Sequence, residues 1–311
     1  MSHVKTIAGT FAILAILLCL LPSLSRDWFS AFIGGMRLHI AIAAFLFSLA
    51  FICIGRTAWH APPLFIAAAL LLYVGYLHET VVQRAAAGTP GASFRLIEFN
   101  MLGDNDRGGD IAAWLIAEKA DVIYALESGP LRAHLPELEK VYPYRIGCGE
   151  MTTRCDLMML SRHPLEDGKL LSMGSLRSER FIRASIELDG RQVNLVAAHF
   201  TKPFFDAIQQ DELRVAQRRL RRIEGPVVLG GDFNSSLLSP DIIAFMKASG
   251  LRAHAHEPRT WPVNIPAIGL PIDHILVRAP AHIDSLKRMP DALGSNHFGL
   301  IADISLRETA R

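Results

Sequence analysis

The residues best suited to chemistry lie in three short motifs in the C-terminal third of the sequence. They are Gly231-Asp232-Phe233-Asn234, Ile272-Asp273-His274 and Ser295-Asn296-His297. Carboxylate and amide oxygens are ligands for hard divalent cations, and an imidazole beside a carboxylate can exchange a proton near neutral pH. These residue types together suit metal-assisted acid–base chemistry.

Further polar residues follow or interrupt apolar runs, at the points where strands are expected to end. This set comprises Asn100, Glu127, His199, Asp232, Asn234 and Asp273. Side chains at strand ends are held by a packed sheet, which suits an active site. Any one of them alone is more commonly a cap, a turn residue or a hydrogen-bonded edge residue. Their recurrence at strand ends favours a shared site.

The elements that must position these residues alternate between strands and helices from Phe94 onward. Strands are expected at 94–100, 121–126, 156–161, 226–230, 272–277 and 300–305, with a hairpin of 182–188 and 192–199 around Asp189-Gly190. Helices are expected at 110–119, 206–224 and 241–249. Because hairpins and helical connections are mixed, the pattern predicts an α/β sandwich of mixed sheets.

Three uncharged apolar stretches precede this part of the chain. They lie between Lys5 and Arg26, between Arg37 and Arg56, and between Arg56 and Glu79. A bilayer core of about 30 Å needs roughly 20 apolar residues as helix. Three transmembrane helices are therefore expected, at about 6–25, 38–55 and 59–78. A cleavable signal peptide is the alternative for the first stretch, but no small-x-small cleavage site closes it.

The sequence thus divides into a membrane domain of residues 1–84, a linker of 85–93 and a domain of 94–311. The linker is expected because this segment is rich in Ala, Gly, Thr and Pro. Residues 1–93 hold five of the 32 basic and two of the 30 acidic residues, which leaves 27 basic and 28 acidic residues in the remainder. Proteins that neutralise many phosphates usually carry a clear positive excess. Long nucleic acid is therefore the less favoured partner.

Basic residues do not decide the orientation across the membrane. One face would carry Lys5 and Arg56, and the other Arg26, Arg37 and Arg84. If the N-terminus is cytosolic, three spans place residues 94–311 outside the cytosol.

Cys148 and Cys155 give an independent indication of the compartment. Their separation suits a hairpin disulfide, which would imply an oxidising environment. Two free thiols or weak metal ligands are the alternatives.

The motifs also occur in a recognisable order. The series runs Phe99-Asn100, Ala125-Leu126-Glu127-Ser128, Leu160-Ser161-Arg162-His163-Pro164, Ala198-His199 and then the three C-terminal motifs. It resembles the endonuclease/exonuclease/phosphatase superfamily over residues 94 to about 305. The preceding membrane helices resemble, more loosely, bacterial members with an external catalytic domain, including the VanJ-like group. The resemblance implies a four-layer α/β sandwich and a divalent cation, usually Mg²⁺, with Mn²⁺ as the alternative.

The resemblance assigns the metal side of the site to three residues. Glu127 would bind the cation with Asn100 beside it, and Asn296 stands where the family usually has an Asp. An Asn keeps an oxygen ligand but loses a negative charge. The expected consequence is weaker metal affinity or a weaker second metal position.

The resemblance assigns the catalytic side to five residues. Asp232 would orient or activate the attacking water, Asn234 would hold phosphoryl oxygens, and His199 would donate a hydrogen bond to the same group. Asp273 would pair with His297, which would act as general base or as an electrostatic partner of the phosphate.

The resulting expectation is a multi-pass protein of the bacterial cell membrane with a periplasmic or extracellular catalytic domain. It would hydrolyse a phosphate ester or pyrophosphate by in-line attack of water, and tethering favours a lipid-linked substrate. An extracytoplasmic nuclease is the first alternative. The second is a catalytically inactive membrane protein that binds a phosphorylated ligand, for which Asn296 is the sequence support.

Overall fold

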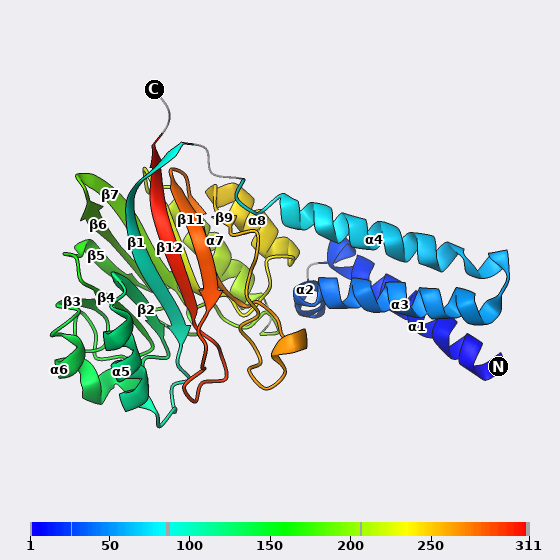
Figure 1. Ribbon diagram of the computed structural model, residues 1–311, viewed down its shortest axis with the longest axis horizontal. Coiled ribbons are helices and arrows are strands. Elements are labelled where there is room, and N and C mark those ends of the chain that lie inside the picture. Colours follow the sequence, from blue (N-terminus) through cyan, green and yellow to red (C-terminus); the bar gives the residue numbers. More distant parts are fainter. Residues whose placement is uncertain (1, 26, 85–87, 206, 309–311) are drawn as a thin grey trace.

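The structure is a computed structural model that describes residues 2–25, 27–84, 88–205 and 207–308. A group of N-terminal helices projects from a domain built on two β-sheets (Figure 1). These helices are α1 (Ser2–Leu24), α2 (Trp28–Gly35), α3 (Arg37–Gly55) and α4 (Pro62–Glu79), with the 3₁₀ turn η1 (Ala58–His60) before α4. Residues 3–24, 37–55 and 58–79 are long and apolar enough to cross a membrane. The three expected spans are confirmed in length and composition.

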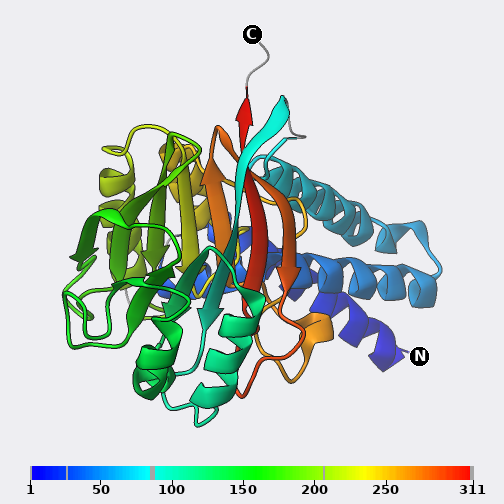
Figure 2. The same ribbon diagram turned by 60° about the vertical axis from the view of Figure 1, so that its left-hand side comes forward.

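The N-terminus lies at the end of the long helices that is farther from the domain (Figures 1 and 2). Helix α1 runs toward the domain, α3 runs away from it, and α4 returns to it (Figure 1). If all three cross a bilayer, the N-terminus and the domain therefore lie on opposite sides. Arg26, which enters the charge comparison across the membrane, lies outside the described residues.

The short helix α2 is not anticipated by the sequence analysis. Its N-cap is Asp27, whose Oδ1 accepts hydrogen bonds from the backbone N–H groups of Phe29 (2.9 Å) and Ser30 (3.0 Å). This contact satisfies two donors that a helix start leaves free. With eight residues, α2 is too short to span a bilayer. It lies at the domain-facing end of the long helices (Figure 1).

Within the described residues, the domain contains twelve strands. They are β1 (Thr89–Asn100), β2 (Val122–Leu126), β3 (Tyr144–Ile146), β4 (Leu157–Ser161), β5 (Glu166–Leu171), β6 (Phe181–Leu188), β7 (Arg191–Ala198), β8 (Val227–Asp232), β9 (Arg252–Ala253), β10 (Asp273–Arg278), β11 (Ala281–Arg288) and β12 (Leu300–Glu308). One sheet has the order β11-β12-β1-β2-β4-β3 and the other β5-β6-β7-β8-β10-β9. Both are mixed, because β1–β2 and β7–β8 pair in parallel and the remaining neighbours are antiparallel.

Helices cover the outer faces of both sheets and complete four layers (Figures 1 and 2). Helices α5 (Gly108–Glu118) and α6 (Leu135–Leu138) share a buried cluster with β1, β2 and β4. Helices α7 (Ile208–Leu220) and α8 (Pro240–Ser249) pack on β7 and β8, in a cluster that continues into α1, α3 and α4. A third cluster fills the space between the sheets. The expected four-layer sandwich of mixed sheets is confirmed.

Element ends differ from expectation in several places. Strand β1 begins at Thr89 rather than Phe94, inside the segment expected as linker, of which residues 85–87 lie outside the described residues. The hairpin is confirmed: Leu188 pairs with Arg191, and Asp189 and Gly190 both have positive φ (51° and 75°), as a two-residue turn requires. Strands β3, β5, β9 and β11 are not anticipated by the sequence analysis.

Candidate functional site

The polar strand-end residues meet at one edge of the two sheets. Asn100 ends β1, Glu127 follows β2, and His199 follows β7. Asp232 ends β8 and Asp273 begins β10, and the antiparallel register places these two residues directly opposite each other. Strand direction therefore brings residues far apart in sequence to one place.

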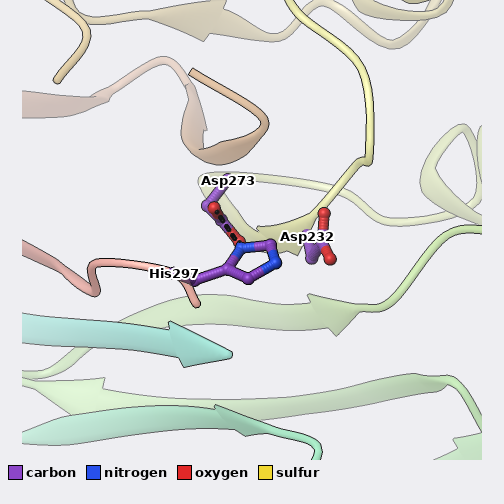
Figure 3. A group of neighbouring side chains, drawn as sticks. All are labelled: Asp232, Asp273 and His297. Carbon is purple, nitrogen blue, oxygen red and sulfur yellow. Dashed lines mark hydrogen bonds and ion pairs between the residues drawn. The ribbon is translucent and has the colours of Figure 1, made fainter. Parts of the chain in front are cut away.

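His297 and Asp273 form a buried ion pair. The Nδ1 atom of His297 lies 2.9 and 3.1 Å from the two carboxylate oxygens of Asp273, and both side chains are almost fully buried. Figure 3 shows the other ring nitrogen of His297 turned toward Asp232. Burial lowers the pKa of His297, but the negative charges of Asp273, Asp232 and Glu127 outweigh burial and raise this pKa to about 9. The expected pair is present, and it holds the imidazole in its protonated form.

The loop that carries His297 is fixed to the end of β1. The Ser295 hydroxyl donates to the carbonyl oxygen of Asn100 at 2.7 Å, and the backbone N–H of His297 donates to the same hydroxyl at 3.1 Å. The backbone N–H of Asp273 donates to the hydroxyl of the buried Thr260 at 3.3 Å. The imidazole and its carboxylate are therefore each positioned by a buried hydroxyl.

A second imidazole–carboxylate pair lies on the other side of Asp232. His199 Nδ1 lies 3.1 Å from Asp156 Oδ1, and His199 Nε2 lies 3.7 Å from Asp232 Oδ2. Asp156 also accepts a hydrogen bond from the buried guanidinium of Arg180. Burial raises the pKa of Asp156, but the hydrogen bonds and charges of His199 and Arg180 outweigh burial and lower it to about 2.

Asp156 and Arg180 belong to none of the motifs recognised in the sequence. Asp156 directly precedes strand β4 and Arg180 directly precedes β6, so each stands at the end of an apolar run. Their position beside an apolar run is the signal in the sequence that points to these two residues. This signal alone does not assign them to the site, because the partner of each residue lies on another strand.

Asp232 is held by the backbone and side chain of its own motif. Its Oδ1 accepts from the backbone N–H of Asn234 at 2.7 Å, and its Oδ2 accepts from the side-chain amide of Asn234 at 3.1 Å. That amide also donates to the carbonyl oxygen of Phe200 at 3.0 Å. Burial and the neighbouring Asp273 raise the pKa of Asp232, against the opposing charges of the two histidines. Asn234 thus positions Asp232 in this structure.

Close strand packing explains the glycine of the Gly-Asp-Phe-Asn motif. Gly231 has a φ of +149°, and a Cβ built on it would lie 1.7 Å from the carbonyl oxygen of Ala198 on the neighbouring strand. A larger residue would push β7 and β8 apart, and His199 and Asp232 with them.

Glu127 and Asn100 form the third part of the site. The Glu127 carboxylate accepts from the backbone N–H of Gly103 at 2.9 Å and from the Asn100 amide at 3.3 Å. The same amide nitrogen donates to Asp232 at 3.1 Å. Glu127 has a φ of +50°, an uncommon conformation for a residue with a Cβ. Asn296 is exposed and lines the same cavity as Glu127.

A further carboxyl group lies beneath the site. Glu98 is fully buried on β1, and its two oxygens have no hydrogen-bond partner among the described residues. Burial, with the charges of Asp273 and Asp232, raises its pKa well above the usual value. The site therefore contains more carboxyl groups than the neighbouring side chains pair with.

The donor set fits a hard divalent cation. Ligand atoms of Asp232, Asp273 and His297 lie within 4.8 Å of one another, and Glu127 adds a carboxylate and Asn100 an amide on the same side. Mg²⁺ and Mn²⁺ prefer such oxygen ligands. Burial is the main cause of the raised pKa values of Asp232 and Glu98, and the negative charge of neighbouring aspartates adds to it; a cation would offset that neighbouring charge.

Two adjoining cavities open onto these residues. One, of about 370 Å³, is lined by Glu127, His199, Asp232, Asn234, Asn296 and His297, together with residues of α2 and several apolar side chains. The other, of about 860 Å³, shares Glu127, His199, Asn234 and Lys202 with the first and adds the cationic side chains Arg154, Arg177 and Arg180. Asn100 and Asp273 lie behind the cavity walls and bond to residues that line them. All eight predicted site residues thus meet in one place, and their individual roles stay predictions.

Two other sequence expectations have clear outcomes. Cys148 and Cys155 form a disulfide, as expected, and Cys155 lines the cationic cavity. His274 points away from the site: its ring bonds to Glu257 (2.9 Å) and to the carbonyl oxygen of Ser235 (2.9 Å), which agrees with the structural role expected for it.

A four-layer sandwich with acidic and histidine residues at one sheet edge defines a class of protein, and comparison with known protein families identifies that class. Residues 97–297 match the model of the Endonuclease/Exonuclease/phosphatase family. Because this match covers more than half of the sequence, the chain belongs to that family. No curated protein matches the chain. The looser resemblance to the VanJ-like group stays a prediction.

Several solved structures share the fold. An endonuclease/exonuclease/phosphatase from Bacteroides vulgatus is 20% identical, with a TM-score of 0.56 over 70% of this chain and 100% of that one. TDP2 of D. rerio, in complex with a single-strand DNA product, is 15% identical, with a TM-score of 0.56 over 69% and 100% of the two chains. Sphingomyelinase C from Streptomyces griseocarneus is 16% identical, with a TM-score of 0.51 over 68% and 99%. At these identities the likeness establishes the fold alone.

Proposed function

We propose that the protein is a membrane-anchored phosphoesterase that hydrolyses a phosphate ester or pyrophosphate with the help of Mg²⁺ or Mn²⁺. The observation that carries this proposal is the pair of imidazoles on either side of Asp232. His199 is held by Asp156 and His297 by Asp273, each through Nδ1. Each imidazole is therefore left with Nε2 for the shared space, which suits binding of a phosphoryl group between them.

Glu127 would hold the cation, with Asn100 beside it and Asn296 on the exposed side of the cavity. When bound, the cation would stabilise charge that builds on the phosphoryl oxygens during in-line attack. His297 is protonated at neutral pH because of its pKa of about 9, so it donates a hydrogen bond to a phosphoryl oxygen. His199 donates from the opposite side. Asp232 accepts the hydrogen bond of the attacking water and orients it.

The surroundings favour a lipid-linked substrate over nucleic acid. Residues of α2, next to the membrane spans, line the cavity that holds the catalytic side chains. The domain beyond residue 93 has 27 basic against 28 acidic residues, which is not the excess typical of nucleic-acid binding. The fold itself does not choose, since a sphingomyelinase and a DNA-bound protein both share it.

We also propose that the domain lies outside the cytoplasm of a bacterial cell. The Cys148–Cys155 disulfide supports an oxidising compartment, and three spans would separate the domain from a cytosolic N-terminus. A reporter enzyme fused after Arg311 tests this placement. Activity of a periplasm-dependent reporter is expected, and activity of a cytosol-dependent reporter would refute it.

The enzymatic proposal is tested with the detergent-solubilised full chain. A polyprenyl pyrophosphate, a phospholipid and plasmid DNA are incubated with Mg²⁺ or EDTA, with His297→Ala as the inactive control. Phosphate release from lipid that depends on Mg²⁺ and on His297 is the expected result. Nicked plasmid without lipid turnover would support the nuclease instead. Absence of metal-dependent turnover on all three substrates would leave the ligand-binding alternative.

A further inference from the structure

The 370 Å³ cavity has two chemically different walls. One contains the catalytic side chains together with Lys202, Ser235 and Ser236, and the other is apolar and comes partly from the membrane-side helices. The apolar wall contains Phe32, Met36, Leu102, Pro203, Phe204, Trp261, Leu270 and Ile272. A cavity that recognised only an inorganic or sugar phosphate would gain nothing from such a wall, because apolar contact stabilises only apolar ligand surface.

Helix α2 is fixed against the domain at the point where it lines the cavity. A Cβ on Gly34 would lie 3.0 Å from Pro240 Cδ at the start of α8, so the helix backbone packs closely there. Two residues earlier, the ring of Phe32 meets that of Phe204 with centroids 6.3 Å apart. Phe204 follows His199 by five residues, so this ring contact joins α2 to the catalytic loop.

A second segment of the domain also contacts a membrane span. The ring Nε2 of His39, in α3, lies 3.0 Å from the carbonyl oxygen of Ile268 in the 3₁₀ turn η3 (Pro266–Ile268). Figure 1 shows this segment, in orange, beside the domain-facing end of the helices. Ile265 and Ile268 are exposed on it. Exposed apolar residues next to spans indicate contact with the bilayer.

We infer that the apolar wall formed by α2 and Phe204 binds the hydrocarbon tail of a membrane lipid whose phosphate is cleaved, and that the tail enters from the bilayer beside α2. This inference rests on the proposed function and adds the place and residues of tail recognition. The occupant is a lipid rather than a protein helix, because the cavity is continuous with the membrane helices on one side and with His199, Asp232 and His297 on the other. A substrate in this position is taken from the leaflet on the domain side.

Helix α2 provides a matched pair of residues for the test. Phe32 and Phe29 are the same residue type, lie one turn apart and have equal exposed fractions of 41%. Phe32 lines the cavity, while Phe29 is not among its lining residues and packs against Trp28. Gly35 offers the opposite perturbation: its Cβ would meet Ser235 Oγ at 3.8 Å and nothing nearer, so a larger side chain there would extend into the cavity.

The experiment measures kcat/KM of the full chain in vesicles and detergent for long-tailed and short-tailed versions of one lipid phosphate. A prenyl series and a diacyl series are run in parallel, to identify the tail. Phe32→Ser and Gly35→Leu are expected to lower the long-to-short ratio of kcat/KM by about tenfold, the loss expected for one apolar side-chain contact. Phe29→Ser is expected to leave the ratio unchanged.

The outcomes separate the two proposals. Equal ratios for wild type, Phe32→Ser and Gly35→Leu would overturn the tail site while leaving the phosphoesterase proposal intact. Absence of turnover of either tail length by the wild type would instead reject the phosphoesterase. In that case, a photoreactive lipid phosphate with its label next to the headgroup still tests the tail site. Labelling of α2 or of 203–205 that Gly35→Leu suppresses supports the inference, and labelling elsewhere refutes it.

Discussion

Asp156→Asn is the substitution that best tests whether the second imidazole is catalytic. Asp156 holds His199 through Nδ1 and neutralises the buried Arg180. Its pKa falls from 3.8 to about 2. At about 1.36 kcal/mol per pKa unit, the fold stabilises the carboxylate by roughly 2.4 kcal/mol. Because this pKa is lowered, the stabilisation is present above pH 3.8 and disappears as the pH falls toward 2.

Two measurements at pH 7 then separate structure from catalysis. The lost stabilisation should lower the melting temperature by roughly 5–10 °C. The lost charge-assisted hydrogen bond to His199, worth about 1.5–3 kcal/mol, should lower kcat roughly 10- to 150-fold. Adding Arg180→Gln should recover part of the melting temperature but not kcat, since the double variant no longer buries an unpaired guanidinium.

Asp303→Asn is the matched control for this experiment. Asp303 is also an Asp with a lowered pKa that pairs with an arginine, Arg95 at 2.8 Å, but it lies on β12 away from both cavities. Its substitution should leave kcat unchanged. If Asp156→Asn keeps wild-type kcat while losing stability, Asp156 serves only to neutralise Arg180, and the two-imidazole mechanism is wrong.

Three further predictions concern the metal, the anion and the core. Calorimetric titration should show that Mg²⁺ binds about tenfold more tightly to Asn296→Asp and more weakly to Glu127→Gln, because each change alters one unit of charge at the cavity. Equal Mg²⁺ affinities of the wild type and both variants would contradict the metal assignment. Arg177→Gln should raise KM for an anionic substrate several-fold at low salt, an effect that should shrink at about 0.5 M salt as screening increases; a KM that does not depend on salt would argue against anion binding in that cavity. Burial lowers the pKa of His274, but Glu257 and the other partners of His274 outweigh burial and raise this pKa. The His274–Glu257 pair therefore stabilises the fold fully below about pH 6.5 and less at higher pH. Glu257→Gln should therefore lower the melting temperature by roughly 3–10 °C at pH 6, with a smaller difference at pH 9; a pH-independent difference would show that the ion pair is not the cause.

The sequence predicts the centre of each sheet better than its margins. All eight expected strands are present, and the four missed strands, β3, β5, β9 and β11, are the outermost strand on each side of the two sheets. Edge strands have one side exposed and carry polar residues, as in the Glu166–Leu171 and Ala281–Arg288 segments. They therefore lack the apolar runs by which the inner strands are recognised.

The candidate site shows a similar division. Residues within a short motif, such as Asp232 and Asn234, can be recognised from spacing, since their contact is local. The positions of Asp156 and Arg180 in the site depend on the pairing of β4 with β2 and of β6 with β7. The spacing of nearby residues in the sequence does not predict those contacts. The same limit applies to α2, whose importance comes from its contact with Phe204 far along the sequence.

Charge pairing indicates where a cation would first bind. Asp232, Asp273 and His297 lie close enough to share an ion, but Asp273 and His297 already neutralise each other, and an ion there would have to displace the His297 proton. Glu127 forms no ion pair among the described residues and accepts only from a backbone N–H and an amide. A cation at Glu127 therefore gains charge neutralisation without breaking an ion pair. It would leave His297 protonated and free to contact the phosphate.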